Sequence, residues 1–338
     1  MFKRLLIVLE PGGAEACVPP WMLSMAQACD GELVFFTCMS TASPVASDLL
    51  EIELSTRWDS FDEMRSGVER MHEEARLQAG QFGIRTSSMI SHATHTVAGI
   101  LAAAAASGCD LIVVCNRTGN TLVRWLSGNV IPGLVSSSPW PILVCPRGLP
   151  AEETPSARRP RVSIVVEGGD PSPLAFGHGL EIAGDLGAEV LLVHIKPCVT
   201  VLWLEVEAMV GSTSDRLEDA IQEQSRHMLA ASLALAERAG LRAETVSLPS
   251  STSGRDVARL AAGQGCDLIV STQRRGNAVM RFINGNLTAG LISAAKKPVL
   301  IFPGSEPAAS DPSATLMPRS GSSVEAANAA DRCERRRH

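Results

Sequence analysis

The sequence predicts an α/β protein made of two similar domains, each with a five-stranded parallel sheet covered by helices on both faces. Short aliphatic runs alternate with amphipathic stretches along the chain, as in successive βαβ units. This pattern repeats at a constant spacing of 157 residues, which takes Gly119 to Gly276 and Gly128 to Gly285. A repeat of this length indicates a duplicated domain, since solenoid repeats are much shorter.

In the first half strands are expected at residues 4–9, 32–38, 84–90, 110–115 and 141–145, most of which are short apolar runs. Helices are expected between them at residues 20–28, 61–81, 97–106 and 129–136. The second run has no polar alternation, which is typical of a strand buried on both faces. In the second helix Met64, Val68, Met71 and Ala75 recur at three- and four-residue spacing, so we expect a long amphipathic helix there.

The second half repeats this order of elements. Strands are expected at residues 162–166, 189–195, 241–248, 267–271 and 298–302. Helices are expected at residues 173–186, 216–239, 255–262 and 286–294. Because parallel strands need crossover connections, and these are nearly always right-handed, each half is predicted to be a Rossmann-like, doubly wound sheet.

Composition predicts how these domains are joined. The two domains are expected at residues 1–147 and 160–304, connected by a linker at 148–159 that is rich in proline, glutamate and arginine. Residues 305–338 are mostly serine, alanine, proline and glycine, without apolar periodicity, so a disordered tail is expected.

Charge and cysteine content narrow the class of protein. The 338 residues carry a formal net charge of −6 and 45% hydrophobic residues, which suits a globular protein and disfavours non-specific nucleic-acid binding. The nine cysteines form no C-x-x-C pair, so buried reduced thiols are expected. His92 and His95 have no third ligand nearby in sequence, and no metal site is predicted.

The hydrophobic runs are short. None approaches the roughly 20 apolar residues of a membrane span. The N-terminal run stops at Leu9, too early for the apolar region of a secretory signal, which needs about 7–15 residues and a cleavage site. We therefore expect a soluble, cytoplasmic protein without membrane contact.

One loop motif occurs in both halves. Residues 117–130 and 274–287 share the form R-x-G-N-x3-R-aromatic-aliphatic-x-G-N-aliphatic, and each copy follows the fourth predicted strand. A glycine-rich loop between a strand and a helix is where α/β proteins usually bind an anion. The matched aromatic residues, Trp125 and Phe282, are expected to pack the loop against its domain.

In its strand order, its acidic-glycine turns after the first strands and this loop before the last helix, the chain resembles a tandem universal stress protein. The resemblance covers about residues 2–147 and 160–304 and implies an adenine nucleotide alpha hydrolase-like fold with a stress-response function. ATP-binding members of that family carry G-x-x-G, nine residues, and then G-S or G-T. The glycines let backbone N–H groups approach phosphates, and the hydroxyl adds a donor.

This motif is degenerate in both halves. The sequences are C-N-R-T-x9-G-N from Cys115 and T-Q-R-R-x9-G-N from Thr272. Three of the four motif positions differ in each half, at Cys115, Thr118 and Asn129 and at Thr272, Arg275 and Asn286. A Cβ at a glycine position disfavours positive φ and narrows the space for a phosphate, although an arginine there is able to pair with one. ATP binding is therefore expected to be weak, altered or absent.

The resemblance also implies which residues face a nucleotide. The adenine-side acid, usually an aspartate after the first strand, falls on Glu10 and Glu167; the alternative for both is a solvated strand-end carboxylate. No catalytic residue is expected. The binding residues implied are Glu10, Pro11, Gly12, Cys38, Cys115, Arg117, Thr118, Gly119, Gly128, Asn129, Glu167, Gly168, Gly169, Ile195, Thr272, Arg274, Arg275, Gly276, Gly285 and Asn286.

The last predicted strands, 141–145 and 298–302, are the candidates for contact between the halves. In the family that the chain resembles, this strand mediates dimerisation, so the resemblance implies that the two halves pair through it within one chain. Such pairing would also cover two exposed sheet edges. A further homodimer of the tandem unit stays open. His194, at the end of a strand where this family often has histidine, is expected to be structural.

These observations favour a non-enzymatic stress-response protein that acts by binding a ligand or a partner. ATP or another adenine nucleotide is the ligand that the resemblance implies, and the degenerate motif leaves open that neither half binds one. The first alternative is a slow ATPase that uses the loops 115–129 and 272–286. The second is a nucleic-acid-associated regulator, which the acidic balance of charge disfavours.

Overall fold

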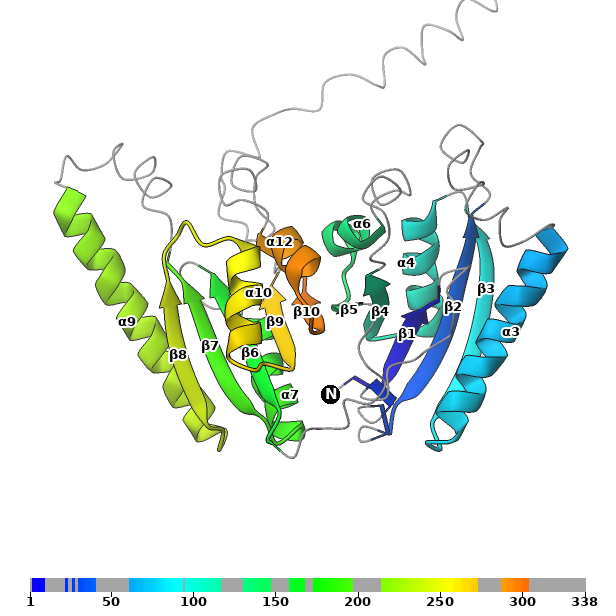
Figure 1. The fold of residues 1–338 in the computed structure, drawn as a ribbon, viewed down its shortest axis with the longest axis horizontal. Helices are drawn as coiled ribbons and strands as arrows, with labels where there is room; N and C mark the ends of the chain where they lie inside the picture. The colour runs from blue at the N-terminus through cyan, green and yellow to red at the C-terminus, as the bar shows by residue number, and fades with distance from the viewer. Residues whose placement is uncertain are drawn as a thin grey trace, which may run out of the picture. The chain divides into compact units, whose positions relative to one another are not determined.

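The computed structural model contains two successive series of five strands with the helices that connect them (Figure 1). It describes residues 2–9, 22–23, 26–27, 30–40, 61–93, 95–116, 130–146, 158–167, 173–196, 214–272 and 287–303. The first series is β1 (Arg4–Val8), β2 (Glu32–Ser40), α3 (Phe61–Gly80), β3 (Arg85–Ala93), α4 (Thr96–Ser107), β4 (Leu111–Asn116), α6 (Val130–Ser137) and β5 (Ile142–Pro146). The second is β6 (Arg161–Glu167), α7 (Pro173–Asp185), β7 (Glu189–Ile195), α9 (Ser214–Arg238), β8 (Ala243–Leu248), α10 (Gly254–Gly263), β9 (Leu268–Thr272), α12 (Leu287–Ala294) and β10 (Val299–Phe302).

The predicted α/β fold class is confirmed. Each strand expected from the sequence is present, with ends that differ by three residues at most. The largest shift is at β3, which continues to Ala93 because β2 pairs with it as far as Ser40. The helix expected at residues 20–28 lies mostly outside the described residues. The boundaries of the domains, linker and tail remain a prediction.

The sheet order of each half creates a switch point. In the first half β1 is hydrogen-bonded in parallel to both β2 and β4, and the order is β3-β2-β1-β4-β5. The chain moves outward from β1 to β3 and then crosses to β4 on the other side. The second half repeats this with β6 between β7 and β9, so β1/β4 and β6/β9 are equivalent strand pairs.

Both faces of the sheet are buried, as the continuous apolar runs predict. Phe35 and Phe36, which are neighbours on β2 and point to opposite faces, are each fully buried. The first core contains Phe35 with residues of α3, among them Val68 and Ala75. The second contains Phe36 with residues of α4 and α6, among them Ile100 and Leu134. The result is a three-layer arrangement of helix, sheet and helix.

The last strands of the two halves contact each other. β5 and β10 pair antiparallel with the register Val144 to Val299, Leu143 to Leu300 and Ile142 to Ile301. This pairing links the two five-stranded series into one sheet of ten strands. Phe302, at the end of β10, also stacks on Phe2 with ring centroids 6.4 Å apart, which adds an aromatic contact between the halves.

Candidate functional site

The switch points lie at the carboxyl edge of the sheet. In the first half β1 ends at Val8, two residues before Glu10, and its neighbour β4 ends at Asn116. In the second half Glu167 is the last residue of β6 and Thr272 is the last residue of β9. From the first strand of each pair the chain continues to one side of the sheet, and from the second strand it continues to the other side. In doubly wound sheets this divergence opens a crevice at the carboxyl edge. The strand ends that precede the predicted binding loops are therefore adjacent.

The described residues include only part of the predicted site. Cys38 on β2 and Ile195 on β7 occupy matched positions and are buried. Thr272 is partly buried, and the backbones of Cys115 and Glu167 complete β4 and β6. The remaining predicted residues lie outside the described part of the chain, and their role stays a prediction: Glu10, Pro11, Gly12, Arg117, Thr118, Gly119, Gly128, Asn129, Gly168, Gly169, Arg274, Arg275, Gly276, Gly285 and Asn286.

A buried polar chain fixes the exit of β1 toward Glu10. The Thr37 hydroxyl donates a hydrogen bond to the carbonyl of Leu9 at 2.8 Å, and its oxygen lies 2.8 Å from Nε2 of His72 on α3. Because the hydroxyl has one hydrogen, which Leu9 accepts, His72 must donate from Nε2–H. The Leu9 N–H donates in turn to the carbonyl of Phe36 at 2.8 Å. The residue before Glu10 is therefore held through both its N–H and its carbonyl.

His72 is neutral in this environment. Its side chain is 3% exposed, and burial lowers its pKa from 6.5 to about 4. Its Nδ1 atom is buried and has no hydrogen-bond partner among the described residues. Sequence reasoning missed this residue, although one signal was present: His72 interrupts an apolar helical stripe between Met71 and Ala75.

The second half places its histidine differently at the same junction. At the spacing of 157 residues, Thr37 corresponds to His194 on β7 and His72 corresponds to Leu229 on α9. His194, which the resemblance suggests is structural, is 1% exposed. Each half thus buries one imidazole beside its switch point, supplied by the helix in the first half and by the strand in the second.

The helices that follow the predicted phosphate loops are set by close contacts with a neighbouring helix. In the second half α12 begins at Leu287 and packs against α10 through Gly254 and Gly290; a Cβ built on Gly254 would lie 2.0 Å from the Leu287 carbonyl oxygen. In the first half a Cβ on Gly133 of α6 would meet the Val97 side chain of α4 at 2.9 Å. The start of α12, directly after Gly285 and Asn286, therefore depends on a glycine in α10.

The shifted pKa values of the thiols and of Asp256 have structural causes. Burial raises the pKa of Cys38, and it raises the pKa values of Cys109 and Cys266 to about 11, so these thiols are protonated near neutral pH. The pKa of Asp256 is lowered because the side chain and backbone of Ser253 donate hydrogen bonds to its carboxylate. No group of three or more potential metal ligands occurs among the described residues.

Comparison with known proteins identifies the family. Two α/β domains with doubly wound sheets and paired last strands define a class of Rossmann-like tandem proteins, and the family model of the universal stress protein family matches residues 1–146 and again residues 159–303. The chain therefore belongs to the universal stress protein family and carries two of its domains. The curated proteins include no match to this sequence.

Two solved structures share the fold over most of the chain, and a third matches less than half of it. A universal stress protein from Archaeoglobus fulgidus DSM 4304 is 15% identical with a TM-score of 0.61, over 89% of this chain and 97% of that chain. A putative universal stress protein from Pseudomonas aeruginosa UCBPP-PA14 is 16% identical with a TM-score of 0.54, over 89% and 93%. A universal stress protein solved in complex with cAMP matches 42% of this chain and 97% of that chain at 20% identity, with a TM-score of 0.31.

No helix in the described part of the chain has the length and apolar character that crossing a membrane requires.

Proposed function

We propose that this protein is a non-catalytic stress-response protein, each half of which binds a small ligand at the carboxyl edge of its sheet. The observation that carries the proposal is the switch of connections between β1 and β4 and between β6 and β9. Ligands of doubly wound sheets bind outside the carboxyl ends of the strands at such a point. An acidic residue follows or ends the first strand of each pair, as Glu10 and Glu167.

The proposed ligand is an adenine nucleotide that is held without strong contacts to a triphosphate. The acidic residues offer acceptors to a base or a ribose hydroxyl. The glycine positions that would admit the phosphates carry side chains, as Cys115, Thr118 and Arg275. Micromolar ATP binding is therefore not expected, while Asn129 and Asn286 still offer amide donors and good caps at the helix starts.

The surroundings of the buried cysteines and of His72 support binding of a ligand without its chemical conversion. The thiols of Cys38, Cys109 and Cys266 are buried with raised pKa values, which makes them poor nucleophiles. His72 donates to Thr37 through Nε2 and is enclosed by the core, so it lacks access to a substrate. The hydrogen bonds of Thr37 to Leu9 and His72 hold the exit of β1 in place beside the crevice.

Native mass spectrometry of the purified chain, followed by titration calorimetry with ATP, ADP and AMP, tests the proposal. We expect a nucleotide or another small ligand to be retained at substoichiometric levels, ATP binding weaker than micromolar, and no release of phosphate. Saturable micromolar binding of ATP to both halves would refute the degenerate-site assignment. Steady ATP hydrolysis that is lost in Glu10→Gln and Glu167→Gln together would refute binding without turnover.

A further inference from the structure

The second half has a basic cavity at the edge of the sheet opposite its switch point. The cavity has a volume of about 300 Å³ and lies where β6 and β7 begin. Its lining consists of Arg158, Arg159, Arg161, Glu189, Gln264 and Gly265. Atoms of three arginines and one glutamate therefore line the same small volume, which is at the lower end of the range for small-molecule sites.

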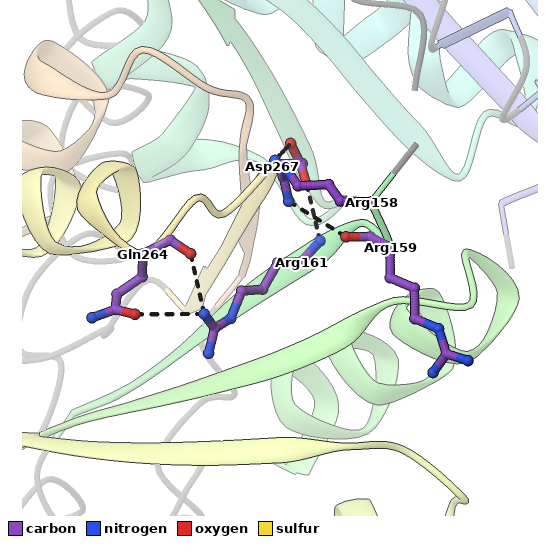
Figure 2. Close-up of polar contacts among 5 residues, drawn as sticks. All are labelled: Arg158, Arg159, Arg161, Gln264 and Asp267. Atoms are coloured by element: carbon purple, nitrogen blue, oxygen red, sulfur yellow. Dashed lines mark hydrogen bonds and ion pairs between the residues drawn. The ribbon is translucent and has the colours of Figure 1, made fainter. Parts of the chain in front are cut away.

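Two of the three arginines are held in place by the protein. A guanidinium nitrogen of Arg158 lies 2.7 Å from the carboxylate of Asp267. This carboxylate also accepts a hydrogen bond from the backbone N–H of Arg161 at 2.9 Å (Figure 2). The Arg161 guanidinium donates to the Gln264 carbonyl at 3.2 Å and pairs with Glu244. The Arg161 side chain is only 16% exposed, so its charge is fixed at the wall of the cavity.

Arg159 differs from its two neighbours. Its backbone carbonyl accepts a hydrogen bond from Arg158 at 3.4 Å, while its side chain extends away from Asp267 (Figure 2). The Arg159 guanidinium has no hydrogen-bond or ion-pair partner among the residues that the structure describes. Arg159 is therefore a lining arginine whose guanidinium donors are not engaged by the residues that the structure describes.

The first half shows that the fold does not require this cluster. Arg4 and Glu32, which match Arg161 and Glu189, form an ion pair at 3.2 Å, and Asp110 accepts the backbone N–H of Arg4 just as Asp267 does for Arg161. The positions of Arg159 and Gln264 are instead taken by Phe2, which stacks on Phe302, and by Ser107. Arg158 and Arg159 are thus additions of the second half to a strand start that forms without them.

We propose that this cavity binds a small phosphate-bearing anion, with Arg159 as the principal contact and Arg158 and Arg161 as fixed positive charges. Arginine suits a phosphate because its planar guanidinium donates two parallel hydrogen bonds. The cavity is larger than one phosphate group, and the Glu189 carboxylate and the Gln264 amide offer partners for hydroxyl groups. A sugar phosphate therefore fits the lining better than inorganic phosphate.

Titration calorimetry of the full chain with ribose 5-phosphate tests this site. Arg159→Gln should weaken binding roughly tenfold, because it removes charge-assisted hydrogen bonds at a partly exposed position. Arg255→Gln is the matched control, since Arg255 is an exposed arginine at the opposite end of α10 from Gln264, about 15 Å along the helix axis. The control should leave the affinity unchanged, and both variants should keep the wild-type circular dichroism spectrum.

Removing a negative charge from the lining, in place of a positive one, sharpens the test. Among the described lining residues Glu189 carries the carboxylate, so Glu189→Gln should tighten the binding of inorganic phosphate several-fold. A purely structural arginine cluster would not produce this gain. Three outcomes would overturn the proposal: no saturable binding of ribose 5-phosphate at millimolar concentration, equal affinity in Arg159→Gln, or an equal loss in Arg255→Gln.

Discussion

The two halves have the same fold but build the neighbourhood of their switch points from different residues. Ala79 on α3 and Ala236 on α9 are both fully buried, which shows that the long helices pack in the same register. At the strand that faces them, the first half has the pair Thr37 and His72, and the second has His194 and Leu229. The two halves therefore share the apolar pattern of the fold and differ in the polar residues beside their switch points.

The helix contacts beside the predicted loops differ in the same way. In the first half α4 meets α6 through a valine and a glycine, Val97 and Gly133, whereas in the second α10 meets α12 through Gly254 and Gly290. A glycine pair lets two backbones approach more closely than a side chain does. The start of α12 is thus set by backbone contact, and the start of α6 by a side chain that is able to adjust.

The largest expected effect follows from this difference in helix contact. Gly254→Ala should destabilise the chain by roughly 3 kcal/mol or more, because the new methyl group would meet backbone atoms of α12. Gly133→Ala should cost less, about 1–2 kcal/mol, because the Val97 side chain is able to shift. Urea unfolding of both variants measures the two costs. An equal or smaller loss in Gly254→Ala would contradict the account of α10 and α12.

The second prediction concerns pH and the buried His72 of the first half. The pKa of His72 is about 4 in the folded chain and about 6.5 when unfolded, so the unfolded state binds the extra proton between these values. Stability should therefore be complete above pH 6.5 and fall as the pH drops toward 4, by at most roughly 3 kcal/mol.

The control for the pH effect is His72→Leu, which copies the residue of the second half. In this variant Thr37 still donates to Leu9, and the decline between pH 6.5 and 4 should be shallower than in the wild type. Unfolding free energies measured across this range give both slopes. If the slopes are the same, burial of His72 does not govern the acid sensitivity of the chain.

The smallest expected effect is at the start of α10. Ser253 caps this helix by accepting from the N–H of Asp256, while Asp256 accepts from the N–H of Ser253. Ser253→Ala should cost about 1 kcal/mol. His95, which precedes α4, makes no side-chain cap, so His95→Ala should be close to neutral. Thermal melting compares the two variants, and a larger loss in His95→Ala would show that the capping box contributes little.

The fold was predictable because its signals are local. Apart from the edge strands β3 and β8, the strands are largely apolar runs, and Val68, Met71 and Ala75 define the buried face of α3 by spacing alone. The end of β3 could not be predicted, because its extension to Ala93 depends on pairing with Ser40 of another strand. Edge strands end where their partner ends, and no local signal records that.

The site was predictable only in its position. The strand ends around β1 and β4 follow from sheet order, but Thr37 and His72 are 35 residues apart, and no motif links a strand threonine to a helix histidine. The basic cavity combines residues 158–161 with Gln264, more than one hundred positions away. Such contacts arise from tertiary packing between residues that are far apart in the sequence. The sequence alone therefore contains no characteristic spacing that would reveal them.

We propose that the carboxyl-edge sites are adenine-nucleotide sites whose phosphate loops lack two of the three motif glycines. The most direct measurement is the ATP affinity of the wild-type chain beside that of a chain with Cys115→Gly, Thr118→Gly and Asn129→Ser, which restores the full motif in the first half. We predict weak binding in the wild type and at least a tenfold gain in the restored chain. Micromolar binding in the wild type, or no gain on restoration, would contradict the claim.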